Sequence, residues 1–188
     1  MKQLADDAQC LAACGVLCQA VKLEPPEPSY GSLFNETFVN PQKLAVALQP
    51  LGLSLTHLCF ITLGNAYDEI PAGWARDLSQ ALPRLEVLHL HSLEPLPGLE
   101  DLVLHSASLR LLHITSVQKP STEWLLTFLR ACVFPRPVYF QAVLKVQLPG
   151  ATVATRVVKQ LWTDLTVGLE MAGSVMVIDE QGNNILAN

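Results

Sequence analysis

Histidines are the side chains of this 188-residue chain best suited to chemistry. The chain has five, and His89, His91, His105 and His113 follow one another closely. Imidazole titrates near neutral pH and binds Zn, Ni and Cu. Three interpretations follow: exposed side chains without a common role, part of a partner-binding face that weakens at acidic pH when the cluster becomes charged, or a transition-metal site. No carboxylate shell is evident around the cluster to orient the rings, which counts against the metal site.

Cysteines offer a second kind of chemistry. Their odd number, five, and their irregular spacing argue against a disulfide scaffold. Cys10, Cys14 and Cys18 recur every four residues and would lie on one helical face. We favour small apolar packing residues there, because free cysteine is usually buried; the alternative is a three-thiolate metal site. Cys59 could add a soft metal ligand or pair with His89 as nucleophile and base, but no third member or oxyanion hole is recognisable.

The motifs of common enzyme classes are missing from the sequence. It contains no GxSxG, HExxH, GxxxxGK[ST] or GxGxxG pattern. Its net charge of −5 leaves no basic footprint for nucleic acid. No apolar run reaches the roughly 18 residues that a membrane span needs. We therefore predict a cytoplasmic or nuclear protein that is not an enzyme and carries no cofactor.

The spacing of leucine indicates the elements that position these side chains. Leucine accounts for 34 residues, and the clearest pattern, LxxLxxLxL, runs through residues 82–90 and again through 96–104. Leu109, Leu112 and Ile114 repeat its end. Neither a helical period nor strict strand alternation produces this spacing. A strand preceded by a bend that buries two more leucines does produce it.

The segments 82–90 and 96–104 resemble the strand segments of leucine-rich-repeat proteins, most closely the irregular repeats that follow F-box domains in plants and fungi. The resemblance implies an α/β solenoid: a short, curved, mostly parallel sheet with helices on its convex side. We expect residues 1–188 to form a single degenerate leucine-rich-repeat domain, with its clearest repeats at 82–117. No F-box is found in the chain.

Weaker copies of the core motif predict further strands. Their central apolar positions fall at 21, 58, 88, 102, 112, 146 and about 177. Helices are predicted between them at 41–49, 74–82, 121–132 and 153–171, with Ser121 or Thr122 as a cap of the third. The intervals around position 102 are too short for a strand and a helix, so residues 99–114 form either helix-free repeats or a hairpin. A turn at 181–184 and a final strand at 185–187 complete the chain, and this end is a candidate for packing against another subunit.

In repeats of this type, the leucines of LxL point into the core and the residues between and after them face the open, concave surface. We therefore expect His89, His91, His105 and His113 to share one patch, because neighbouring strands lie about 4.8 Å apart. The predicted partner-binding residues are Cys59, Ile61, His89, His91, Asp101, Val103, His105, His113 and Thr115.

The expected function is recognition of a protein or peptide on the concave sheet surface, with substrate recognition as the role that the resemblance implies. One alternative is a metal- or pH-responsive binding protein that uses the histidine patch. Another is a structural subunit of a larger assembly, which the apolar composition (50% hydrophobic, 15% charged) would suit.

Overall fold

The computed structural model describes residues 1–23, 41–62, 73–92, 96–118, 120–133, 139–147, 153–167 and 173–187. Six strands in these ranges form one sheet in which every neighbouring pair is parallel and the strands follow chain order. They are β1 (Ala20–Leu23), β2 (His57–Thr62), β3 (Val87–Ser92), β4 (Leu111–Gln118), β5 (Phe140–Gln147) and β6 (Gly173–Ile178). The predicted α/β class with a mostly parallel sheet is confirmed.

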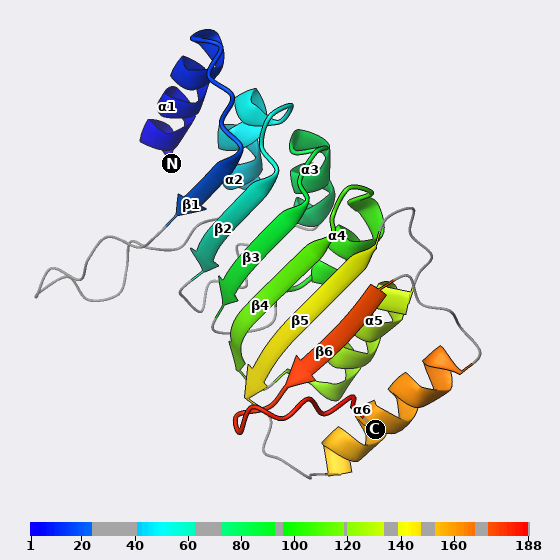
Figure 1. The fold of residues 1–188 in the computed structure, drawn as a ribbon. Helices are drawn as coiled ribbons and strands as arrows, with labels where there is room; N and C mark the ends of the chain where they lie inside the picture. The colour runs from blue at the N-terminus through cyan, green and yellow to red at the C-terminus, as the bar shows by residue number, and fades with distance from the viewer. Residues whose placement is uncertain are drawn as a thin grey trace, which may run out of the picture.

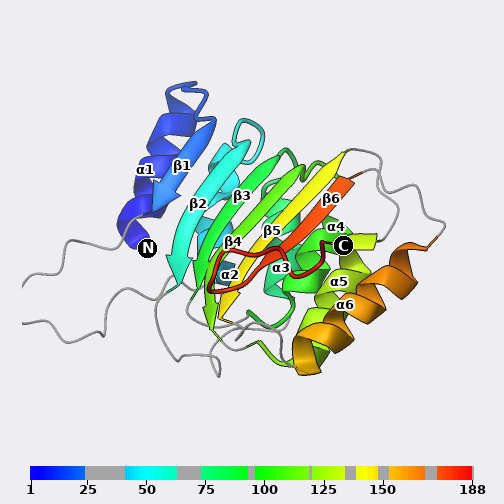
Figure 2. The same cartoon turned by 60° about the horizontal axis from the view of Figure 1, so that its bottom comes forward.

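Helices separate the strands, as parallel pairing requires. They are α1 (Lys2–Ala13), α2 (Pro41–Leu48) with the short 3-10 turn η1 (Gln49–Leu51), α3 (Trp74–Ala81), α4 (Leu99–His105), α5 (Thr122–Val133) and α6 (Val153–Thr166). Each helix packs against the next along the chain. Figures 1 and 2 show this row on one side of the sheet, while none of the described helices covers the other side. We call the uncovered side the open face.

Strand alternation assigns side chains to the two faces. In β3, Leu88 and Leu90 are buried, whereas His89 and His91 are only partly buried. Register places the central leucines in line across the sheet, with Leu58 opposite Leu88 and Leu88 opposite Leu112. These side chains join the helices' apolar faces in one core. Burial of each such leucine contributes about 1.5–3 kcal/mol, which makes this alternation hard to reverse.

The same backbone arrangement recurs where the strands begin. A single carbonyl accepts hydrogen bonds from two consecutive amides of the next repeat, at distances between 2.8 and 3.0 Å. The three cases are Gln19 O with the amides of Thr56 and His57, Thr56 O with those of Glu86 and Val87, and Glu86 O with those of Arg110 and Leu111. Successive units are therefore stacked through equivalent backbone positions.

Two serines add an equivalent side-chain bond. Ser54 Oγ donates to Cys18 O at 3.1 Å, and Ser108 Oγ donates to Leu85 O at 2.9 Å. Each serine lies four residues before the central leucine of the strand that follows it. The carbonyl that it reaches lies three residues before the central residue of the preceding strand, Val21 or Leu88. The turns that enter the strands are thus repeated in their side-chain bonds as well as in their backbone.

The predicted strand around position 102 is wrong, and so is the alternative of a hairpin over 99–114. Residues 99–105 form helix α4, which begins after Gly98 in a left-handed conformation (φ 77°). Leu99, Leu102 and Val103 are buried on one side of this helix, whereas Leu104 is 42% exposed. The spacing i, i+3, i+4 is that of a helical face, so the same leucines satisfy a helix. The sheet consequently has six strands in the described residues, with no member between β3 and β4.

The other helix predictions are close to the structure. Ser121 Oγ accepts a hydrogen bond from Trp124 N at 3.1 Å, which confirms Ser121 as a cap. The helix predicted over 153–171 ends at Thr166, and residues 168–172 lie outside the described ranges. Helix α1 ends at Ala13, so Cys14 and Cys18 do not continue its face. Cys10 and Cys14 are exposed, which makes the predicted burial of these cysteines wrong.

The last described residues fold back along β6. Gly182 (φ 84°) turns the chain, Ile185 N donates to Val177 O at 2.8 Å, and one antiparallel bridge joins Ile178 to Asn184. Leu186 is 6% exposed and belongs to the core. The predicted turn is confirmed, but the predicted final strand is reduced to this bridge. The outer edge of β6 is therefore covered by the chain itself.

Candidate functional site: the open face of the sheet

The outward side chains of the strands form rows that run across the sheet. The central row contains Lys22, Cys59, His89, His113, Val143 and Met176, each opposite the next in register. A flanking row contains Ala20, His57, Val87, Leu111, Gln141 and Ser174. These side chains are partly or fully exposed because no helix in the described ranges covers them.

Histidines occupy the centre of this face. The rings of His89 and His113 lie edge to face, with their centroids 5.2 Å apart. His91 Nδ1 is hydrogen-bonded to Thr115 Oγ1 on the neighbouring strand. His113 Nε2 is buried and has no hydrogen-bond partner among the described residues.

The environment of the pair favours neutral imidazole. Partial burial lowers the pKa of His89, and charge on His91 and His57 lowers it further. Burial likewise lowers the pKa of His113, with further contributions from His89, Lys145 and His91. Both causes penalise the protonated form, one through lost hydration and the other through like-charge repulsion. Near neutral pH the pair thus adds little positive charge to the face.

The open face and the rest of the molecule differ in charge. Among the described strand positions, the outward ionisable side chains are Lys22, His57, Cys59, His89, His91, His113 and Lys145, with no carboxylate. Glu86 comes just before β3 and lies 3.8 Å from Arg110. The remaining acidic residues of the described ranges lie on helices or in the C-terminal turn: Asp6, Asp7, Asp77, Glu100, Asp101, Glu123, Asp164, Asp179 and Glu180. A chain of net charge −5 therefore presents a face without negative side chains in its described strands.

Most of the predicted binding residues do lie on the open face: Cys59, His89, His91, His113 and Thr115. Ile61 pairs with His91 through the backbone, but its side chain lies outside the described part. Asp101, Val103 and His105 belong to α4, on the covered side of the sheet. The expectation that His105 shares the histidine patch is therefore wrong.

Two cationic positions of this face were missing from the predicted set. His57 directly precedes Leu58, just as Val87 directly precedes Leu88, and the two residues are opposite each other in register. The leucine pattern alone therefore predicts that His57 faces outward. Lys145 lies on β5, and the sequence pattern predicts the wrong register for this strand. Its predicted centre was position 146, but Ala142 is the residue that pairs with Leu112. Alanine gives a weak pattern signal, because its side chain does not identify a core position.

The described residues contain no group of three or more His, Cys, Asp or Glu side chains placed to hold a metal ion. Cys59 is opposite His89 in register, and the next members of that row, Lys22 and His113, provide no carboxylate to orient the imidazole.

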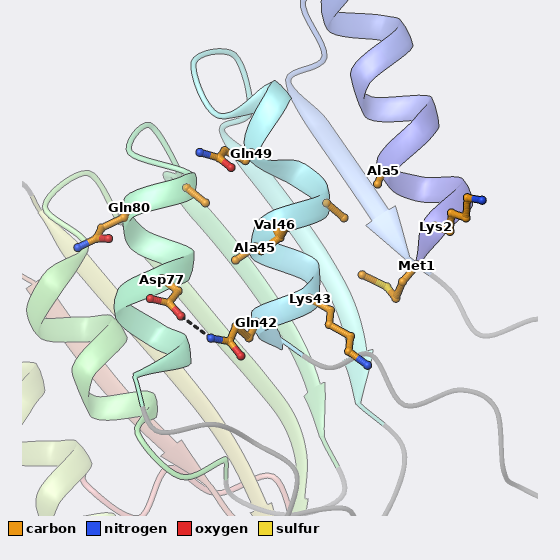
Figure 3. Close-up of a pocket in the computed structure, with 12 residues that line it drawn as sticks. Met1, Lys2, Ala5, Gln42, Lys43, Ala45, Val46, Gln49, Asp77 and Gln80 are labelled. Carbon is orange, nitrogen blue, oxygen red and sulfur yellow. Dashed lines mark hydrogen bonds between the residues drawn. The ribbon is translucent and has the colours of Figure 1, made fainter.

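A cavity of about 530 Å³ lies on the helical side, between α1, α2 and α3. Figure 3 shows Ala45 and Val46 of α2 in its lining, together with Met1 and, from α1, Ala5. Its one carboxylate, Asp77, accepts a hydrogen bond from Gln42 Nε2 at 3.0 Å. No cysteine, serine or histidine is found among the described residues that line the cavity.

No protein-family model, curated protein or solved structure matches this chain. Across the described helices, none combines the length and the apolar character needed to cross a membrane.

Proposed function

We propose that this chain is a non-enzymatic binding module of the leucine-rich-repeat type, and that it recognises a protein partner on the open face of its sheet. One observation carries the proposal. The strands are packed against helices on one side only, while the row formed by Cys59, His89, His113, Val143 and Met176 stays partly exposed on the other.

Repeated geometry supports the choice of family. The strands are parallel and in chain order, and the described helices that separate them lie on the same side. The central positions Leu58, Leu88, Leu112 and Ala142 are 30, 24 and 30 residues apart, within or just above the usual length of about 20–29 residues for such repeats. The carbonyls that each accept two amides, those of Gln19, Thr56 and Glu86, are 37 and 30 residues apart. Solenoids of this kind present extended surfaces to their partners.

The composition of the face suits a protein ligand. Val87, Leu111, Val143 and Met176 provide apolar area between the imidazoles. Interfaces gain most of their affinity from such a desolvated centre, and polar groups around it select the partner. In the F-box proteins that the sequence resembles, such repeats recognise substrates, and we propose the same class of work here.

Site-specific photocrosslinking tests this proposal. Benzoylphenylalanine is introduced at Val143 on the open face or, as a matched control, at Leu104 on the helical side, which is 42% exposed. Each full-length protein is irradiated in native extract after circular dichroism has confirmed its fold. We expect a discrete adduct from position 143 that excess unlabelled wild-type chain removes.

The control position separates the two sides of the molecule. Adducts from position 104 alone would contradict the proposal and assign binding to the helices. Adducts at both positions that excess wild-type chain leaves unchanged would indicate nonspecific capture and would also contradict it.

A further inference from the structure

We infer that the open face binds an acidic peptide segment, with the carboxylates of the segment seated over His89, His113 and Lys145. This inference rests on the proposed function and adds the chemistry of the partner. Three observations support it: the charge of the face, an unsatisfied nitrogen at its centre, and the spacing of its cationic groups.

Charge complementarity is the first observation. The outward side chains of the described strands include Lys22, Lys145 and four histidines but no carboxylate, although the chain as a whole is acidic. Acidic residues in the described ranges are confined to helices, to the C-terminal turn and to Glu86 at the start of β3, which lies near Arg110. Such a separation attracts negatively charged partners and repels positively charged ones.

The second observation is the buried Nε2 of His113, which has no partner among the described residues. A buried polar atom without a hydrogen bond costs about 1–3 kcal/mol, so a ligand that turns this ring outward and hydrogen-bonds to the nitrogen gains affinity. A carboxylate oxygen accepts from N–H and is attracted further when the ring becomes protonated. His89 lies beside this ring, and Lys145 on the next strand is close enough to lower the pKa of His113, so the three cationic side chains belong to one part of the face.

Spacing is the third observation. Lys22, His89 and His113 belong to one row, and neighbouring strands are about 4.8 Å apart. A peptide crossing the strands along this row would meet Lys22, His89 and His113 before the apolar side chains of Val143 and Met176, with Val87 and Leu111 in the flanking row. An acidic stretch followed by apolar residues matches this pattern.

Nucleic acid fits this face less well. Only two of its groups, Lys22 and Lys145, are permanently charged, whereas phosphate backbones are normally held by several lysines and arginines. The apolar side chains between the imidazoles also favour peptide side chains over phosphates. We therefore assign the face to a peptide.

Protons are taken up when an acidic segment binds. His89 and His113 face His57 and Cys59 from β2, His91 from β3, Lys145 from β5 and, at the end of the row, Lys22 from β1. A ligand carboxylate offsets the repulsion among these groups, so the two imidazoles charge more readily in the complex. Binding should therefore strengthen as the pH falls, the reverse of the weakening in acid that one of the three interpretations of the histidines predicts.

A random dodecapeptide library displayed on phage, selected on the immobilised full chain at about pH 6, tests the inference. We expect the recovered peptides to be enriched in Asp and Glu. Their affinity, measured with synthetic fluorescein-labelled copies, should fall several-fold at about pH 7.5 and fall again in roughly 0.5 M NaCl.

Single substitutions test which side chains bind the acidic peptides. The single changes Lys145→Gln and His113→Gln should each weaken the acidic peptides by about tenfold, the loss typical of one charge-assisted hydrogen bond. Arg130→Gln is the matched control, because Arg130 is an exposed cation on α5. It should leave the affinity unchanged.

The outcomes separate the inference from the proposed function. Recovered peptides that lack acidic residues, yet lose binding in Val143→Arg, would overturn the inference and leave the open face as the binding surface. Tighter binding of a single-stranded oligonucleotide than of any acidic peptide would also overturn it. A library without binders counts against the inference, whereas the crosslinking experiment decides the proposed function independently.

Discussion

His89 and His113 meet edge to face across two parallel strands, with ring centroids 5.2 Å apart. The contact exists because β3 and β4 pair in register, which places residue 89 directly opposite residue 113. It is favourable for neutral rings and unfavourable when both are charged. The contact therefore links the stability of the sheet to pH.

The first prediction concerns this linkage. The pKa values of His89 and His113 are lowered in the folded chain, so the unfolded chain takes up protons first as the pH falls below about 6.5. The contribution of the two neutral imidazoles to the stability of the folded chain is therefore fully present above about pH 6.5. It is lost as the pH falls toward their lowered pKa values. We expect urea unfolding to show a fall in stability between pH 7.5 and 5 that is smaller in the variant with both His89→Gln and His113→Gln. The same fall in both proteins would contradict the linkage; His105→Gln, an exposed change on α4, is the control.

The second prediction distinguishes helix α4 from the strand expected in its place. Leu102 is fully buried and Leu104 is 42% exposed. Leu102→Ala should lower the free energy of unfolding by about 2–5 kcal/mol, and Leu104→Ala by less than about 1 kcal/mol. Chemical denaturation of the two variants measures the difference. In a strand with the LxL pattern both leucines would be buried, so equal losses would contradict the helix.

A tryptophan hydrogen bond gives the third prediction. Trp74 Nε1 donates to Pro97 O at 2.6 Å from a side chain that is 1% exposed, which ties α3 to the turn before α4. Trp74→Phe removes the donor, leaves this carbonyl unsatisfied and creates a small cavity, so we expect a loss of about 2–3 kcal/mol in thermal or chemical unfolding.

Trp124 is the matched control for that change. Its Nε1 reaches Leu96 O only at 3.4 Å, and its ring stacks on Phe128, a contact that phenylalanine retains. Trp124→Phe should therefore cost less than about 1 kcal/mol. A larger loss than that of Trp74→Phe would refute the importance assigned to the shorter bond.

Asp179 provides the fourth prediction. Burial opposes ionisation of this carboxylate, but the backbone and side chain of Asn183, with further backbone bonds from Gln181 and Gly182, outweigh it and lower the pKa. The stabilisation is present above the ordinary aspartate value of 3.8 and is lost as the pH falls through the lowered pKa. Asp179→Asn should lower the urea midpoint at pH 7, and the two proteins should converge in acid. Asp164→Asn, exposed on α6, serves as control, and a constant difference across this range would contradict the role of ionisation.

Local periodicity determined much of the fold. Leu58, Leu88 and Leu112 are each followed two residues later by another apolar residue. A strand that is covered on one face buries both of these apolar side chains and turns the residue between them outward. This is why the class, all six strands and the outward direction of Cys59, His89, His91 and His113 were predictable. The cap at Ser121 was predictable for a similar reason, since its hydrogen bond is made within one turn.

The remaining features depend on contacts between distant segments. The leucines of residues 96–104 fit a strand motif and a helical face equally well, and the choice was decided by β3 pairing directly with β4 while α4 packs between α3 and α5. That choice moved Asp101 and His105 to the covered side of the sheet. Likewise, the pairing of Ala142 with Leu112 set the register of β5 and brought Lys145 to the histidines. Periodicity within a segment determines which side chains share a face, whereas its neighbours in space determine which element it forms and what lies beside it.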